Sequence, residues 1–170
     1  MNISLRSVRL TDSEIIYKWK NDLFIKEMAL DYDYKTTLLE QETDISNSIS
    51  NKHSDYQIIV LNNVLPIGYI RIDWMDNLHK IAWLRFALGT ERGKGYSIIA
   101  LRSFLANLIE NGCLRIEGEV YDFNVASKNV LEKLGFVKEG NKRKAHFNGD
   151  KFSDIHIYGL LAHELKDEFR

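Results

Sequence analysis

The spacing of apolar residues along the chain alternates between two periods. Where apolar and polar residues alternate we expect strands, and where apolar residues recur every three or four positions we expect helices. Asn62-Asn63 has the form of a hairpin turn, and Gly112 and Gly135 follow the ends of helical patterns. The expected strands cover residues 3–10, 56–61, 67–74, 81–88, 114–120 and 152–161. Of the expected helices, one starts near residue 12, one runs through about residue 50, one follows Arg92 and one precedes Gly135.

The first helix carries a start signal of its own. Thr11 and Glu14 have the spacing of a capping box, and the helical pattern that follows continues to Leu23. The order of elements is β-α-α-β-β-β-α-β-α-β, with an optional final strand. This order predicts an α/β fold with a mixed, mostly antiparallel central sheet flanked by helices, in a single domain covering residues 1–170.

Composition excludes several classes of protein. The 170 residues, 45% hydrophobic and 28% charged, suffice for one globular domain. A net charge of −1 provides no general attraction for nucleic acid, so we expect no DNA partner. The basic cluster Lys138, Lys142, Arg143 and Lys144 fits a solvated turn as well as a binding patch. No run approaches the roughly 20 apolar residues of a membrane span, and the single Cys113 fits a reducing compartment, so we expect a cytoplasmic protein.

Residues 92–97, Arg-Gly-Lys-Gly-Tyr-Ser, lie between an apolar strand pattern and a helical pattern. A glycine turn at a helix start leaves backbone N–H groups without helical partners, with the positive end of the helix dipole behind them. Gly93 and Gly95 would let the backbone approach a phosphate, and Arg92 and Lys94 add positive charge. A plain strand-to-helix turn has the same appearance. The spacing fits neither a dinucleotide-binding fingerprint nor a P-loop.

The same segment resembles motif A of the GNAT acyltransferase superfamily, which binds the pyrophosphate of acetyl-coenzyme A. Arg92, Gly95 and Ser97 occupy its defined positions, with Ser97 in place of the usual glycine or alanine. Residues 124–136 resemble the family's Asn-x-x-Ala/Ser…Leu-Gly-Phe signature. The similarity extends over almost the whole chain and is closest to the ribosomal-protein N-acetyltransferase-like branch. It implies the GNAT fold and acetyl-CoA as cosubstrate, bound by Leu88, Arg92, Gly93, Lys94, Gly95, Tyr96, Ser97 and, through its pantetheine amides, Asn124.

In GNAT folds the pantetheine arm lies between two strands that separate, which the resemblance places here at residues 81–88 and 114–120. Glu119, five residues before Asn124, resembles the catalytic glutamate of the ribosomal-protein alanine N-acetyltransferases. Partial burial there would raise its pKa and suit it to accept an ammonium proton. Glu117 lies on the same face and is the second candidate. The structural alternative is an exposed Glu119 paired with a cation.

The proton donor is less sharply indicated. Many family members carry a tyrosine where this chain has Leu131. Ser127 resembles the serine used by the branch that acetylates ribosomal-protein N-termini, and the structural alternative is that Ser127 caps a helix. Tyr121 and His146 are further candidate donors. The aromatic stretch 31–34 follows the first helix, and the resemblance makes it a candidate for acceptor contacts or for cover over the sheet edge.

We therefore expect an N-acetyltransferase that moves an acetyl group from acetyl-CoA to a primary amine. A direct ternary-complex mechanism is expected, because no activated Cys or Ser-His nucleophile is evident. A protein N-terminus, a polyamine, an aminoglycoside and a nucleotide-linked amino sugar are all compatible acceptors. The five histidines lack metal-ligand spacing, so no metal is expected. A family tendency to dimerise implies a homodimer. The missing tyrosine leaves open a non-catalytic acyl-CoA-binding or regulatory domain.

Overall fold

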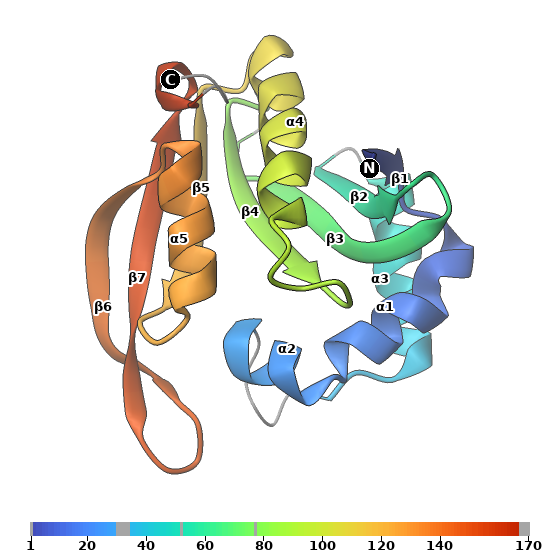
Figure 1. Ribbon diagram of the computed structural model, residues 1–170, viewed down its shortest axis with the longest axis horizontal. Helices are drawn as coiled ribbons and strands as arrows, with labels where there is room; N and C mark the ends of the chain where they lie inside the picture. Colours follow the sequence, from blue (N-terminus) through green and yellow to red (C-terminus); the bar gives the residue numbers. More distant parts are fainter. Residues whose placement is uncertain (1, 30–34, 52, 77, 167–170) are drawn as a thin grey trace.

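The centre of the protein is one sheet of seven strands in the order β1-β2-β3-β4-β5-β7-β6 (Figure 1). The structure is a computed structural model that describes residues 2–29, 35–51, 53–76 and 78–166. Every pairing is antiparallel except the parallel pair β4–β5, which confirms the predicted mixed sheet. The strands are β1 (Ile3–Ser7), β2 (Ser54–Leu61), β3 (Leu65–Trp74), β4 (Ile81–Leu88), β5 (Arg115–Tyr121), β6 (Val137–Phe147) and β7 (Phe152–Leu161). The helices are α1 (Ser13–Lys20), α2 (Leu23–Ala29), α3 (Leu38–Ser50), α4 (Tyr96–Glu110) and α5 (Val125–Leu134), with short 3-10 turns η1 (Leu10–Asp12) and η2 (Ala162–Glu164).

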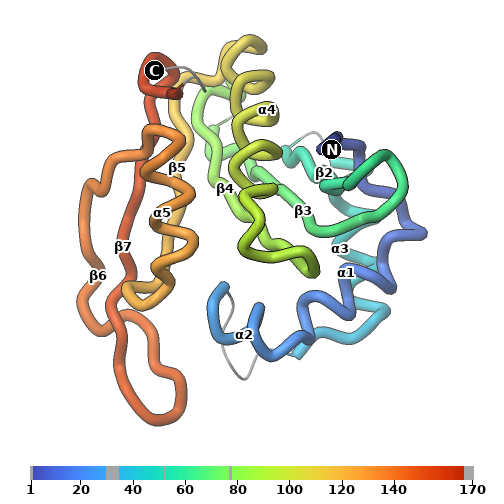
Figure 2. Tube along the Cα trace, viewed as in Figure 1, coloured from blue at the N-terminus to red at the C-terminus, as the bar shows by residue number. Residues whose placement is uncertain are grey.

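The helices form two layers, one on each side of the sheet. Alternate residues of a strand point to opposite faces, so Ile59 joins the core under α4 and α5 while its neighbour Ile58 joins the core under α1 and α3. Figure 2 shows α4 and α5 on the near side and α2 near the end of β4 and the start of α5. None of the described helices is long and apolar enough to cross a bilayer.

The only parallel pair in the described sheet is also its shortest. β4 and β5 pair from Ile81 with Arg115 to Trp83 with Glu117, and beyond that point they separate. The expected separation of these two strands is therefore confirmed. It leaves the second half of β4 hydrogen-bonded on one side to β3 and facing a gap in the ladder on the other.

The first helical stretch is two helices, not one. Asn21 ends α1, and its side-chain amide donates to the Tyr17 carbonyl (2.9 Å). Asp22 then accepts a bond from the Ile25 N–H (3.3 Å) at the start of α2. Short polar side chains that bond to nearby backbone groups in this way compete with helix continuation, which is why the apolar spacing through Leu23 predicted one helix incorrectly.

The predicted capping box at Thr11 does not form. Helix α1 begins at Ser13, and the preceding Asp12 uses its carboxylate elsewhere. It accepts the Arg9 N–H (2.8 Å) and pairs with both terminal nitrogens of Arg6 (2.7 and 2.8 Å). Burial raises the pKa of Asp12, but these bonds outweigh burial and hold it below its ordinary value. A tertiary ion pair therefore sets this helix start.

The same local pattern does form a capping box at the start of α3. Thr37 Oγ1 accepts the Glu40 N–H (3.2 Å), and Glu40 Oε2 accepts the Thr37 N–H (2.7 Å). Two backbone donors that lack helical partners are thereby satisfied. This accounts for the well-defined start of α3 at Leu38.

The basic cluster does not lie in a turn. Lys138, Lys142, Arg143 and Lys144 belong to β6, which pairs with β7 and forms one of the two edges of the sheet. The register shifts between Lys142 and His146, where Lys144 adopts a φ of 51°. Lysines and irregular register on an edge strand oppose pairing with another chain.

We predict different outcomes for two matched threonine substitutions. Thr37→Ala removes a formed cap and is expected to lower the free energy of unfolding by about 1 kcal/mol, whereas Thr11→Ala is expected to change it by less than about 0.5 kcal/mol. Urea unfolding of both variants measures the difference. Equal losses would contradict the assignment of the capping box to α3.

Candidate functional site

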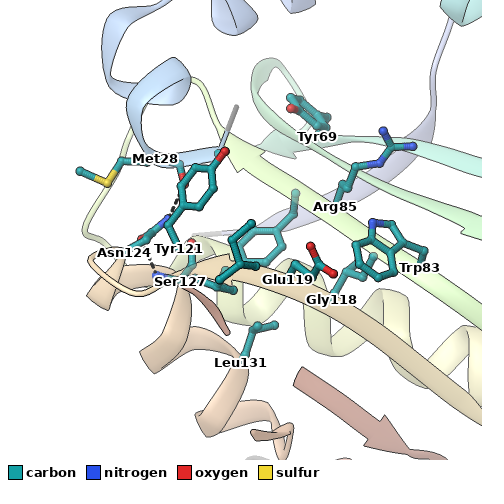
Figure 3. A pocket seen from close by; sticks show the side chains of 15 residues that line it. Met28, Tyr69, Trp83, Arg85, Gly118, Glu119, Tyr121, Asn124, Ser127 and Leu131 are labelled. Atoms are coloured by element: carbon teal, nitrogen blue, oxygen red, sulfur yellow. Dashed lines mark hydrogen bonds between the residues drawn. The ribbon is translucent and has the colours of Figure 1, made fainter. Parts of the chain in front are cut away.

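Two adjoining cavities lie where β4 and β5 separate, and Figure 3 shows the larger of them. The larger, of about 250 Å³, lies between the separated strands, and we call it the splay cavity. The smaller, of about 130 Å³, reaches toward the glycine turn before α4, and we call it the turn cavity. Both are lined by Met28, Ala29, Phe86, Asn124 and Ser127, so the two cavities share one wall.

The glycine turn has the form of an anion-binding cradle. Gly93 and Gly95 have φ values of 77° and 79°, and Gly95 is the residue that precedes α4. No described atom lies within 4 Å of where a Cβ would stand at either position, so the backbone is open to a ligand. Helix α4 has 15 residues and no side-chain cap at Gly95, and the N–H groups that begin a helix point out of it toward a ligand. These residues fit the pyrophosphate of a coenzyme.

Arg92 braces this turn as well as lining the turn cavity. Its Nε donates to the Leu88 carbonyl (2.8 Å), and Nη2 donates to the Gly89 carbonyl (2.8 Å) and pairs with Asp22 (3.0 Å). The guanidinium also lies over the Phe24 ring, 4.5 Å from its centroid. The side chain therefore ties the turn to the end of β4 and to the start of α2, in addition to offering positive charge.

The other residues expected to hold the coenzyme divide into two groups. Leu88, Gly93, Ser97 and Asn124 line the turn cavity, whereas Lys94, Gly95 and Tyr96 do not. Lys94 pairs with Glu91 (2.5 Å). Tyr96 is buried in the core under α4, with 4% of its surface exposed, so its position in the motif is explained by packing.

Glu119 projects from β5 into the splay cavity, where its side chain retains 23% exposure. It also forms an ion pair with Lys142 from β6. Both features expected of it are present together, the position in the splay and the pairing with a cation. Glu117 points to the same face but accepts a bond from Arg115 (2.8 Å) and does not line either cavity.

Asn124 caps helix α5, and Ser127 does not. The Asn124 Oδ1 accepts the Ser127 N–H (3.0 Å), while its Nδ2 donates to the Met28 carbonyl (2.8 Å) (Figure 3). The suggestion that Ser127 caps this helix is therefore wrong, because the cap lies three residues earlier. Asn124 is buried, with 6% exposure, and links α5 to α2 across the wall that both cavities share.

The candidate proton donors lie at different depths. Tyr121 lines the splay cavity and stacks on His146, with ring centroids 4.1 Å apart. His146 is itself 5% exposed and lies behind Tyr121, outside both cavity linings. Leu131, at the position where many family members carry tyrosine, is buried and closes the floor of the splay cavity. Of these candidate donors, Ser127 and Tyr121 are thus the two that line a cavity and can reach a ligand.

Sequence reasoning missed part of the lining. Trp83 and Arg85 of β4 and Tyr69 of β3 gather with Glu119 at one end of the splay cavity (Figure 3). An aromatic residue and a cation at alternate positions of an otherwise apolar strand were the available signal. The candidate acceptor residues 31–34 lie outside the described part of the chain. In that part, no three His, Cys, Asp or Glu side chains are grouped as metal ligands.

An ion-pair network extends from Arg85 across the same face of the sheet. Arg85 pairs with Asp73, Asp73 with Arg71 (3.0 Å), Arg71 with Asp44 (2.7 Å), and Asp44 with Lys20 (3.5 Å). Partial burial, and then the nearby Arg71 charge, lowers the pKa of Arg85, whose side chain stays 53% exposed. Burial also lowers the pKa of Lys20, although Asp44 opposes this. Like charges are therefore held close together in this network.

Residues 2–137 match the family model of the acetyltransferase (GNAT) domain. The uncharacterized N-acetyltransferase p20 of Bacillus licheniformis is 25% identical over 173 residues, covering 95% of this chain and 94% of that protein. The SPbeta prophage-derived uncharacterized N-acetyltransferase YokL of Bacillus subtilis is 34% identical over 79 residues. That match spans 44% of this chain and 43% of YokL, less than half of either.

Solved structures share the fold at lower identity. The spermidine N-acetyltransferase of Vibrio cholerae, in complex with CoA and spermine, has a TM-score of 0.87 at 19% identity, over 95% of this chain and 96% of that chain. The ribosomal L7/L12 alpha-N-protein acetyltransferase RimL, in complex with coenzyme A, has a TM-score of 0.83 at 17% identity, over 95% and 94%. These likenesses confirm the predicted fold.

We predict that stability separates the two polar residues at the start of α5. Asn124→Ala removes the cap and leaves the Met28 carbonyl without its bond, so it is expected to lower the free energy of unfolding by about 1–3 kcal/mol. Ser127→Ala is expected to lower it by less than about 0.5 kcal/mol. Urea unfolding tests both, and a large loss for Ser127→Ala would show that its hydroxyl supports the helix.

Proposed function

The chain belongs to the GNAT acetyltransferase family and is an acetyl-CoA-dependent enzyme, and we propose that it acetylates a primary amine bound in the splay cavity. The observation that carries this proposal is the shared wall at Asn124 and Ser127, which joins the glycine turn to the cavity containing Glu119. A coenzyme held at the turn would have its reactive end where the strands separate, next to a carboxylate.

The coenzyme would be held by the backbone of Gly93 and Gly95, with Arg92 and Ser97 at the wall of the turn cavity. When bound, acetyl-CoA supplies an acetyl group activated as a thioester. The apolar parts of Phe86 and Leu88 would contact the pantetheine arm and exclude water from this passage.

Glu119 acts as the general base in this proposal. An amine attacks only after losing its ammonium proton, and a carboxylate within reach, directly or through one water, can accept it. The bond to Lys142 engages Oε1 and orients the carboxylate.

Ser127 is proposed to donate a hydrogen bond or proton to the sulfur as the thiol leaves. Because Asn124 caps α5, the Ser127 hydroxyl is not required for that role, and it lies in the wall common to both cavities. Tyr121 is the second candidate donor on the splay cavity.

Direct transfer within a ternary complex is proposed, rather than transfer through an acetylated cysteine. Cys113 is 1% exposed just before β5, and burial raises the pKa of its thiol. A neutral, buried thiol is a poor nucleophile. Parallel initial-rate patterns, which indicate a covalent intermediate, would contradict direct transfer.

The function is tested by following thiol release from acetyl-CoA across a panel of peptide N-termini, polyamines, aminoglycosides and amino sugars, with mass spectrometry of the products. One or more N-acetylated products formed well above the hydrolysis rate would support the proposal. Coenzyme binding without transfer to any amine would overturn it and would favour a non-catalytic coenzyme-binding domain.

We predict that charge, more than bulk, at the glycine turn decides coenzyme affinity. Gly95→Asp and Gly95→Asn add side chains of nearly equal size at a positive φ, a conformation that both residues tolerate. Only Asp places a negative charge where the pyrophosphate is proposed to bind, so calorimetry should show at least about tenfold weaker binding to Gly95→Asp than to Gly95→Asn. Equal affinities in folded variants would remove the turn from the coenzyme site.

We predict that Glu119→Gln lowers turnover about 10²- to 10⁴-fold at neutral pH while coenzyme affinity stays near that of the wild type. Partial recovery is expected as pH rises, because the free amine becomes more abundant. Glu117→Gln is the matched control, since that residue lies on the same strand face outside the cavity. A wild-type rate for Glu119→Gln with a good acceptor would make Glu119 structural.

A further inference from the structure

The splay cavity contains a cation that the proposed chemistry does not use. Arg85 projects from β4 on the same face as Trp83, and its side chain is 53% exposed. We propose that Arg85 binds an anionic group of the acceptor, so that the acceptor is an amine carrying a carboxylate or a phosphate a few bonds from its nitrogen. This inference rests on the proposed function and specifies its substrate class.

The strand register places Arg85 across from the proposed base. Trp83 pairs with Glu117 at the last paired position of β4 and β5. Two residues farther along each strand come Arg85 and Glu119, which point to the same face because side chains alternate with a period of two. Paired strands lie about 4.8 Å apart, and these strands have already separated, so a small ligand can lie between the two side chains.

The network behind Arg85 leaves positive charge to be balanced. Among its described members, Lys20, Arg71 and Arg85 are three cations, while Asp44 and Asp73 are two carboxylates. Asp73 is shared between both arginines. A ligand anion at Arg85 would supply the missing negative charge, and a guanidinium has five N–H donors with which to bind both Asp73 and the ligand.

The same charges disfavour a polyamine. An amine placed beside Glu119 would bring a second ammonium toward Arg85, where like charges repel. An acidic amine instead places its nitrogen near Glu119 and its anion near Arg85. The negative charge of Glu119 on β5 and the positive charge of Arg85 on β4 would therefore together select acceptors that carry both an amine and an anion.

The test compares acceptors that differ only in the anion. One arm pairs the dipeptide amide Ala-Asp-NH₂ with Ala-Asn-NH₂, a second pairs glucosamine 6-phosphate with glucosamine, and spermidine is the polycation. In at least one arm the anionic member should exceed its neutral partner by about tenfold or more in kcat/KM, since a hydrogen bond between charged groups contributes on this order. The responding arm identifies carboxylate or phosphate. Equal use of both members, or preference for spermidine, would overturn the proposal.

Variants assign the preference to Arg85. Arg85→Gln should bring the ratio between anionic and neutral acceptors close to one, mainly through a higher KM for the anionic member, while Arg85→Lys should retain part of it. Arg9→Gln is the control, since it removes the same charge from an exposed position after β1. An unchanged ratio in Arg85→Gln would exclude Arg85.

A binding measurement separates this inference from the proposed function. Trp83 lines the cavity beside Arg85, so its fluorescence should respond to anionic acceptors, and Trp83→Phe identifies its signal among the three tryptophans. Binding that requires Arg85 without any acetyl transfer would refute the function and support the anion site. Acetyl transfer that does not distinguish anionic from neutral acceptors would support the function and refute the anion site. If neither acetyl transfer nor binding that requires Arg85 is observed, both proposals are refuted.

Discussion

The end of the β4–β5 ladder after Trp83 and Glu117 is the constraint on which the rest of the site depends. Parallel strands normally continue to exchange hydrogen bonds, and backbone groups left unpaired in the interior are costly. Here the strands separate while each remains fully paired on its outer side, β4 with β3 and β5 with β7. Each half of the sheet thus keeps its backbone hydrogen bonds, and the gap between the two halves leaves space for a ligand.

Side-chain hydrogen bonds, rather than strand pairing, link the elements that surround this space. Arg92 links the glycine turn to the end of β4 and to Asp22, and Asn124 links the start of α5 to the Met28 carbonyl of α2. Both residues belong to family motifs whose implied role is ligand binding. In this chain they also position the walls against which a ligand would lie, so loss of either affects geometry and contacts together.

Local signals predicted most of the fold. Asn62 and Asn63 have φ values of 52° and 60°, as their hairpin requires, and Gly135 ends α5 at 107°. The helix break at Asn21 and Asp22 was missed although its bonds are local, whereas the capping prediction was wrong because a contact outside the pattern decided between two equivalent local patterns. Thr11 and Thr37 each precede a glutamate by three residues, and only the bond between Arg6 and Asp12 shows why the first pattern fails.

The site was less predictable than the fold, because it depends on which strands become neighbours. Motifs named the glycine turn and Glu119 as candidates, but the ion pair between Glu119 and Lys142 joins strands whose pairing with β7 the sequence does not specify. Arg85 was missed because a single charge in an apolar strand does not identify what lies across from it. The register of β4 and β5 shows that Glu119 lies across from Arg85.

Strand β6, at an edge of the sheet, contacts the proposed general base through Lys142. Lys142 pairs in register with Ile155 on β7, and Glu119 with Ile157, so the two charged side chains meet diagonally over the same face. Deleting one residue of β6 before Lys142 would turn it to the opposite face and leave Glu119 without this partner. Exposed edge strands usually tolerate changes in length, but the length of this one is constrained by a carboxylate two strands away.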